Sequence, residues 1–248
     1  MARRPATSCR SLTLQRLNGL PEPTSPAVQK IQLDIRIRAT IFGVNTHDCI
    51  DAMSRPSIRE DILNAGLKVM LQTGYEGASV RDICAAAAAP HGSFTNHFRS
   101  KEAFAAEVLN RYFAHTKELV NQALSDRALT ARQRLRRYLD IISAVLADDK
   151  WNRGCLIGDF SLETVSQSEL LRARLEAIYQ EWRGPFAACI AEAQEAGEID
   201  SAFDSVDLAE FLLASWEGAI LRMKVERGPA ALDRFKNIAF QTIFKERK

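Results

Sequence analysis

The sequence predicts an all-α fold. Apolar residues recur at three- and four-residue steps through most of the chain after residue 57, which is the period of a helix that buries one face. No stretch of useful length alternates apolar and polar residues as a half-buried strand does. Gly197, Gly228 and Pro229 break the pattern into separate helices. We therefore expect a small group of helices at the N-terminal end and a larger helical domain after it.

The composition is that of a globular protein. Its 248 residues are 46% hydrophobic and 26% charged, which suffices for one large or two modest cores. The five cysteines are scattered without CxxC spacing, so neither a disulfide framework nor a zinc site is indicated, and a reducing cytoplasm fits best. No apolar run approaches the roughly 20 residues that span a bilayer, so we expect a cytoplasmic protein with no membrane partner.

Residues 1–52 differ from the rest of the chain. They contain four prolines and scattered arginines, and no apolar stripe persists beyond a turn or two. This composition predicts a disordered tail. Since Met53 directly precedes the first convincing helix, translation is expected to start there naturally. The alternative is a basic arm that adds contacts to phosphates.

Four helices are expected in residues 53–105 and just beyond. The first begins near Ile58 and ends at the Gly74 break, and a short second helix is capped by Ser79 and reaches about residue 87. A third covers Gly92 to His97, and Ser100 caps a long fourth helix over about 101–123. Residues 106–248 form the second domain, with further helices at about 130–147, 156–165, 168–196, 205–226 and 230–244.

Two short helices joined by a tight turn, between a supporting helix and a long one, form a helix-turn-helix that places its second helix in the DNA major groove. The stretches 73–83 and 90–102 resemble the DNA-binding domain of the TetR family, and the resemblance covers about residues 57–109. It implies a repressor that binds a palindromic operator in double-stranded DNA as a homodimer and is released by a small-molecule or electrophilic effector.

The residue types also fit DNA contact. Phe94 and Phe98, four residues apart, are expected to bury the back of the recognition helix and leave its polar side outward. Gly92 permits close approach of the backbone to DNA. The remaining candidates divide into base readers (Thr95, Asn96, His91), phosphate contacts (Ser79, Arg81, His97, Lys101) and Ser93 within the same helix. For any one of these residues, a merely solvated surface is the alternative.

Four positions depart from the family pattern. Relatives commonly have glycine and valine where Ala88 and Ala89 stand, lysine in place of His91 and tyrosine in place of Thr95. If position 88 needs a left-handed backbone, alanine costs on the order of 1 kcal/mol there. These changes keep open the alternative of an all-α ligand-binding or structural protein that has lost its affinity for DNA.

A second candidate site centres on Cys155. The segment Asn152–Glu163 and the later segment Trp216–Lys224 resemble NemR-like members of the family, which respond to electrophiles through a cysteine. A helix N-terminus and a nearby ammonium, Lys224, are expected to favour the Cys155 thiolate. The alternative is an inert packing cysteine. A sensing pocket here would have aromatic walls, chiefly Phe160, Trp182 and Trp216.

The last two helical stretches carry apolar stripes with small residues between them, which suits half of an intermolecular four-helix bundle. Packing within one subunit is the alternative for each residue. No catalytic constellation, phosphate loop or metal-ligand cluster is present, and His91 and His97 are six residues apart, which is not the spacing of a shared metal. We therefore expect no enzyme, no metal and no cofactor, although a helical enzyme remains a rival.

Overall fold

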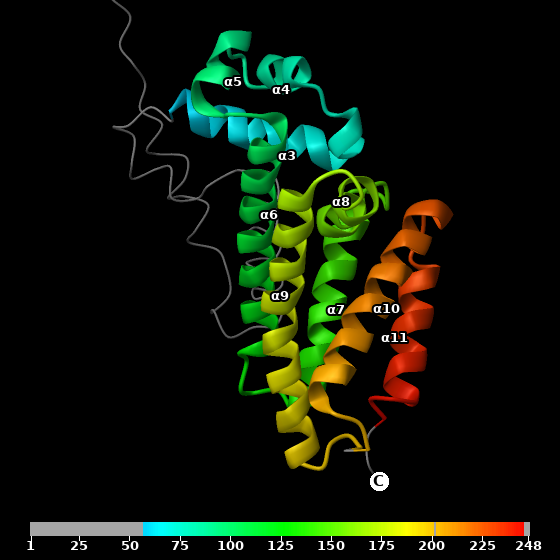
Figure 1. The fold of residues 1–248 in the computed structure, drawn as a ribbon. Helices are drawn as coiled ribbons and strands as arrows, with labels where there is room; N and C mark the ends of the chain where they lie inside the picture. The colour runs from blue at the N-terminus through cyan, green and yellow to red at the C-terminus, as the bar shows by residue number, and fades with distance from the viewer. Residues whose placement is uncertain (1–56, 201, 246–248) are drawn as a thin grey trace, which may run out of the picture. The chain divides into compact units, whose positions relative to one another are not determined.

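The computed structural model describes residues 57–200 and 202–245, and the part it describes is entirely helical (Figure 1). The expected disordered tail and the expected start at Met53 lie outside these residues. The helices are α3 (Ile58–Gly77), α4 (Val80–Ala86), α5 (His91–His97), α6 (Lys101–Leu124), α7 (Ala131–Asp148), α8 (Leu156–Thr164), α9 (Glu169–Glu195), α10 (Ser205–Glu226) and α11 (Ala230–Gln241). The predicted fold class is confirmed.

Side-chain caps set most of the helix starts. The hydroxyls of Ser57, Ser79, Ser100, Thr130 and Ser168 each accept a hydrogen bond from a backbone N–H in the first turn of the following helix. Such caps satisfy amide groups that have no partner inside the helix. The boundaries inferred from the sequence hold within a residue or two, except that α3 continues through the Gly74 break to Gly77 and α11 ends at Gln241, three residues early.

A cluster of three phenylalanines holds the helix-turn-helix together. Phe94 on the back of α5 and Phe98, the residue after the end of α5, meet Phe104 of α6, with ring centroids 5.0 and 4.7 Å from that of Phe104. All three side chains are buried. The Phe104 ring lies against Gly66 of α3 so closely that a Cβ there would come within 2.2 Å of it. The cluster fixes the orientation of the recognition helix α5 against α3 and α6.

The turn between α4 and α5 has the backbone strain that its sequence suggests. Ala88 has φ 51°, in the left-handed region that favours glycine. Two backbone hydrogen bonds keep the turn tight: Ala88 N–H donates to the carbonyl of Ala85 at 3.1 Å, and Ala89 N–H donates to that of Cys84 at 2.9 Å.

We expect Ala88→Gly to stabilise the protein by about 1 kcal/mol, because the left-handed penalty of a Cβ exceeds the entropy that glycine adds to the unfolded chain. Urea unfolding measures the change. Ala85→Gly, inside α4, is the matched control and should destabilise by about 1 kcal/mol. Destabilisation by both variants would show that position 88 is not strained.

The larger domain is a helical bundle in which α6, α7, α9 and α10 pack side by side and α11 covers α10 (Figure 1). Its core contains Phe113, Tyr138, Trp182, Phe186 and Trp216, all almost fully buried. α10 ends at Glu226, as expected, and its C-cap residue Arg227 (φ 53°), rather than Gly228, has the left-handed conformation. The first turn of α6 belongs to the phenylalanine cluster and its remainder to the bundle, so this helix is shared.

The short helix α8 packs against the end of α3. The Phe160 ring meets the Tyr75 ring edge-on, with centroids 5.7 Å apart. The Glu163 carboxylate accepts a hydrogen bond from the backbone N–H of Glu76 at 2.9 Å. Gly74 makes this approach possible, because its φ is 74° and a Cβ would come within 2.2 Å of Glu163 Oε1. The Gly74 break is thus a contact with the second domain as well as a helix irregularity.

Candidate functional site

The recognition helix α5 presents a polar outer face. His91, Gly92, Thr95, Asn96 and His97 are all exposed, as the sequence predicted. Ser93 is half-buried and turns partly inward. The Thr95 hydroxyl donates to the carbonyl of Gly92 at 3.0 Å, so its acceptor lone pairs remain free to face outward. A Cβ at Gly92 would meet nothing within 4 Å, which leaves that position open to an approaching phosphate backbone or base.

The expected phosphate contacts surround this face. Ser79 and Arg81 are exposed at the start of α4, where the Ser79 hydroxyl also caps the helix. Lys101 is half-buried, and its ammonium lies 4.4 Å from the centre of the Tyr75 ring. Arg99, exposed in the turn after α5, is a further cation that the sequence reasoning did not single out. Cations and short polar groups around an exposed helix suit a DNA backbone.

The second candidate site differs from its expected chemistry. Cys155 does stand at the N-cap of α8, but it is only 8% exposed. Burial and the neighbouring Glu217 carboxylate raise the pKa of its thiol well above the usual value. The expectation of a thiolate at rest is therefore wrong, because desolvation and a like charge outweigh the helix N-terminus.

The expected pairing of Lys224 with Cys155 is also wrong. The Lys224 ammonium donates to both carboxylate oxygens of Asp159, at 3.0 Å each. Only the aliphatic part of the Lys224 side chain lies near the segment that precedes Cys155, where its Cδ is 3.4 Å from a Cβ built on Gly154. Asp159, in the first turn of α8, forms an ion pair with the Lys224 ammonium, so Lys224 does not lower the pKa of the Cys155 thiol.

Glu217 of α10 is the functional residue that sequence reasoning missed. Burial raises its pKa to about 7, and its Oε1 has no hydrogen-bond partner among the described residues. Its Oε2 lies 2.6 Å from a Cβ built on Gly158, next to Cys155. The Tyr112 hydroxyl donates to the Cys155 sulfur from the other side at 3.9 Å. A thiol, a phenol and an unpaired carboxyl thus meet in the bundle interior.

The three predicted aromatic residues are buried but do not form one pocket. Phe160 faces Tyr75 at the joint with α3, and Trp216 packs on Phe235 of α11 with centroids 5.5 Å apart. Trp182 lies near the carboxyl cluster, stacked on Tyr179 with centroids 6.4 Å apart. Its indole Nε1 lacks a hydrogen-bond partner among the described residues. Of the three, Trp182 alone borders the polar cluster.

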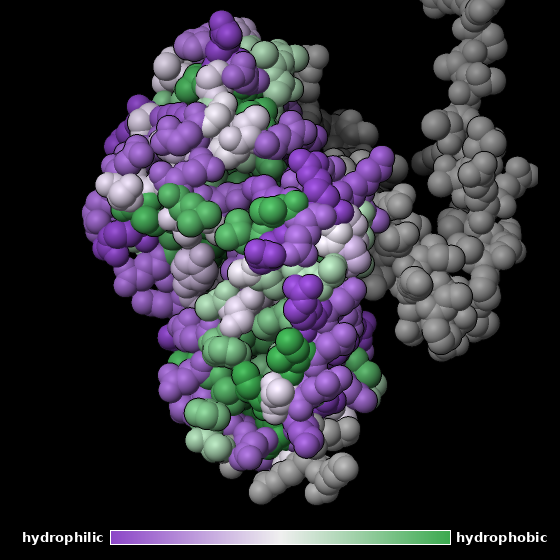
Figure 2. All heavy atoms as spheres, turned by 90° about the vertical axis from the view of Figure 1, so that its right-hand side faces the viewer, coloured by the Kyte–Doolittle hydropathy of each residue, from purple (hydrophilic) through white to green (hydrophobic). Residues whose placement is uncertain are grey.

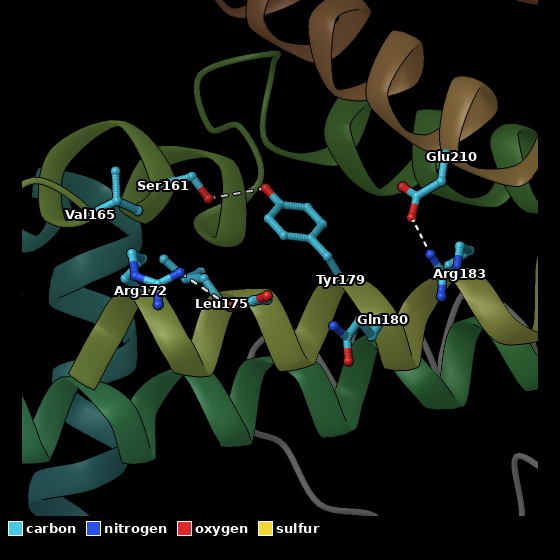
Figure 3. A pocket seen from close by; sticks show the side chains of 9 residues that line it. Ser161, Val165, Arg172, Leu175, Tyr179, Gln180, Arg183 and Glu210 are labelled. Atoms are coloured by element: carbon cyan, nitrogen blue, oxygen red, sulfur yellow. Dashed lines mark hydrogen bonds and ion pairs between the residues drawn. The ribbon is translucent and has the colours of Figure 1, made fainter. Parts of the chain in front are cut away.

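An open groove of about 510 Å³ lies on the outer side of Tyr179 (Figure 3). Tyr179 stands in its centre with its hydroxyl 3.0 Å from that of Ser161. Arg183 of α9 and Glu210 of α10 form an ion pair at one end, at 2.7 Å. Burial and, after it, the charges of Glu217 and Cys155 raise the pKa of Tyr179 to about 12, so this side chain lies near both the groove and the buried groups around Glu217.

In the part of the chain that the structure describes, no group of three or more histidine, cysteine, aspartate or glutamate side chains is arranged to hold a metal ion. No helix within residues 57–200 and 202–245 is long and apolar enough to cross a membrane.

Both parts of the chain match known families. Residues 62–108 match the family model of bacterial regulatory proteins of the tetR family. Residues 131–239 match that of the tetracyclin repressor-like C-terminal domain. The first match covers α4 and α5, most of α3 and the first turns of α6, and the second runs from α7 into α11.

Individual relatives agree with these matches. The HTH-type transcriptional repressor DhaR of Mycobacterium sp. (strain GP1) is 41% identical over 191 residues, 77% of this chain and 94% of the relative. The HTH-type transcriptional repressor NemR of Escherichia coli (strain K12) is 29% identical over 188 residues, 73% and 92% of the two chains.

A solved structure is similar as well. The regulatory protein TetR from Rhodobacter sphaeroides superposes with a TM-score of 0.70 at 32% identity, covering 73% of this chain and 96% of that one. These relatives are transcriptional regulators and not enzymes, so the enzyme alternative is set aside. The chain belongs to the TetR family of DNA-binding transcriptional repressors.

Proposed function

We propose that this repressor acts in the cytoplasm as a homodimer, reads a palindromic operator with α5, and releases it when an effector reaches the Cys155 region. The observation that carries the DNA contact is the exposed polar face of α5 held on the phenylalanine cluster. One short helix contacts too few bases for selectivity, so two copies on two half-sites are required.

The proposed dimer surface is the outer side of α10 with α11. Phe211, Leu221 and Val225 of α10 and Ile238 of α11 are 47, 49, 74 and 57% exposed. Ala214 and Gly218 lie between the large residues at three- and four-residue steps, and both are exposed. Figure 2 faces this side of the molecule and shows hydrophobic side chains gathered among polar ones. An apolar helix face with small residues at its centre suits close packing against a second copy.

The stripe that the sequence suggested for this role is divided between the two sides of α10, with Phe211, Ala214 and Gly218 on the outer side. Leu212, Trp216, Ile220 and Met223 are buried within the subunit against neighbouring helices. α10 is apolar on both sides, and the sequence pattern could not say which side the subunit itself would cover.

The proposed route from effector to DNA is α8. Cys155 stands at its N-terminal end, and Phe160 and Glu163 near its other end contact Tyr75, Gly74 and Glu76 of α3. A ligand that moves α8 would therefore move α3 and, through the phenylalanine cluster, α5. The effector needs to favour the displaced arrangement over the DNA-bound one.

The assignment of base and phosphate contacts is tested by two substitutions. Asn96→Ala should change the sequence preference, at a cost of about 1 to 3 kcal/mol for one base pair if the contact is bidentate. Lys101→Ala should weaken binding to all sequences alike and reduce the salt dependence. Selection from a random DNA pool, followed by titrations at fixed salt, measures both effects. A changed preference in Lys101→Ala but not in Asn96→Ala would reverse the assignment.

The same selection experiment tests the alternative that the protein has lost its affinity for DNA. That alternative arose from the departures at Ala88, Ala89, His91 and Thr95. Enrichment of a palindromic sequence supports an active operator-binding protein. Failure of the wild-type chain to enrich any sequence would favour a protein that has lost its DNA affinity.

A further inference from the structure

We propose that Glu217 is the proton acceptor that activates Cys155 for addition to small uncharged α,β-unsaturated carbonyl compounds. This inference rests on the effector role of the Cys155 region proposed above and specifies its chemistry. It concerns the pair of side chains, one at the start of α8 and one in the middle of α10.

The geometry places the two groups on either side of Gly158. A Cβ built on Gly158 would lie 2.6 Å from Glu217 Oε2 and 3.9 Å from Cys155 Cβ, so the absence of a side chain lets the carboxyl reach the thiol. Besides burial, which raises the pKa of both groups, the Glu217 carboxylate raises the pKa of the Cys155 thiol and the thiol lowers that of Glu217, so the two groups interact. Glu217 Oε1, on the other side of the carboxyl group, has no partner among the described residues.

The charges explain how a buried thiol with a high pKa can react. Above about pH 7 the pair holds one proton, on the sulfur, next to the Glu217 carboxylate. Transfer of that proton to Glu217 leaves a thiolate beside a neutral carboxyl, so the pair never carries two negative charges at once. Against the burial that raises it, the backbone N–H groups of Gly158 and Ile157 at the start of α8 lower the pKa of the Cys155 thiol, so they favour the thiolate once it forms.

The three tyrosines that face the pair stay protonated in this pH range. Burial raises the pKa of Tyr112 and Tyr138 well above the usual value and that of Tyr179 to about 12. Asp159 is paired with Lys224. The facing groups come from α6 (Tyr112), α7 (Tyr138), α8 (Asp159), α9 (Tyr179) and α10 (Lys224). Glu217 is therefore the group that titrates near neutral pH.

The surroundings select the electrophile. Glu217 and Asp159 make the site unfavourable for an anion, and the nearby ammonium of Lys224 is already neutralised by Asp159. The low exposure of Cys155 admits only a small molecule. The Tyr112 hydroxyl, 3.9 Å from the sulfur, is a donor for the oxygen of a carbonyl group.

The reaction balances without a further reagent. The thiol proton moves to Glu217, and the sulfur lone pair forms a bond to the β-carbon of the unsaturated carbonyl compound. The π electrons of the C=C bond move into an enolate, which the Tyr112 hydroxyl stabilises. Glu217 then returns its proton to the α-carbon and becomes a carboxylate again. The product is a neutral thioether on Cys155.

The test is the rate of Cys155 alkylation by acrylamide in the full chain, followed by mass spectrometry between about pH 6 and 9, a range that brackets the titration of Glu217. The variants are Glu217→Gln, Glu217→Asp and Gly158→Ala, in which the new Cβ displaces the carboxyl. Glu210→Gln, an exposed carboxylate on the same helix, is the control. Circular dichroism and operator binding establish that each variant is folded.

The wild-type rate should rise through about pH 7 and then level off, as should that of Glu210→Gln. Glu217→Gln and Gly158→Ala should react roughly tenfold or more slowly at about pH 8, and Glu217→Gln should lose the inflection. Glu217→Asp should retain it. If Glu217 acted only as a like charge, its removal would lower the thiol pKa, and Glu217→Gln would react faster than wild type. That opposite sign would overturn the proposal.

Two comparisons complete the test. Each rate with Cys155 is divided by the rate of the same compound with free glutathione. By this ratio, acrylate should react roughly tenfold more slowly than acrylamide. Equal ratios would contradict the selection against anions. Operator release is followed in parallel. If Cys155 is alkylated with the expected pH profile but the operator stays bound, the assignment of Glu217 stands and the proposed effector role fails.

Discussion

Replacing Leu221 by glutamate is expected to make the protein monomeric and to weaken operator binding by about 10²- to 10⁴-fold, because the second half-site is then no longer held at a high effective concentration. Leu221 is 49% exposed on the outer side of α10, between Gly218 and Val225. A carboxylate there would face its own copy across a two-fold axis, where both charges lose water and repel each other.

Sedimentation equilibrium and operator titration at the same protein concentration measure the two effects. Leu170→Glu is the control, since Leu170 is 46% exposed on α9, away from the proposed surface. This variant should remain dimeric and bind normally. A Leu221→Glu protein that stays dimeric, or a Leu170→Glu protein that dissociates, would place the dimer contact elsewhere.

Phe104→Ala is expected to lower the free energy of unfolding by about 3 to 5 kcal/mol. The side chain is fully buried, and it joins three helices through Phe94, Phe98 and Gly66. Its removal leaves a cavity that the two remaining rings cannot fill without rotating α5. Since domains are stable by only about 5 to 15 kcal/mol, operator binding should fall even where the bundle stays folded.

Urea unfolding followed by circular dichroism gives the loss, and hydrogen exchange shows whether it is concentrated in α3, α4 and α5. Phe203→Ala is the matched control, because Phe203 is 67% exposed and its removal should change stability by less than about 0.5 kcal/mol. A loss below about 1 kcal/mol in Phe104→Ala would mean that the cluster does not hold the DNA-reading unit.

The helix-turn-helix could be predicted from sequence because its signals are local. Caps such as Ser79 and Ser100 act within three residues, and Phe94 and Phe98 share a face through helical periodicity alone. Phe104 was not linked to them, since its contact with Gly66 joins residues far apart in the chain. A left-handed backbone at Ala88 was suggested by the glycine that relatives commonly have at this position, and the structure has it.

The chemistry around Cys155 could not be predicted in the same way. Whether Lys224 pairs with a thiol or a carboxylate depends on how α8 and α10 are aligned, and the alignment brings Asp159 to the ammonium. Glu217 looks like an ordinary exposed glutamate in sequence, between Trp216 and Gly218. Its raised pKa results from burial by other helices, which no local pattern records.

The length of α8 bears on how quickly this repressor can respond. Nine residues of helix extend about 13 Å, and they separate the sulfur of Cys155 from the Glu163 contact with no loop between them. A rigid shift of so short a helix takes microseconds to milliseconds, far faster than a thiol addition to a dilute electrophile. Operator release should therefore follow adduct formation without a lag, so the chemical step at the sulfur would set the response time of the regulated genes.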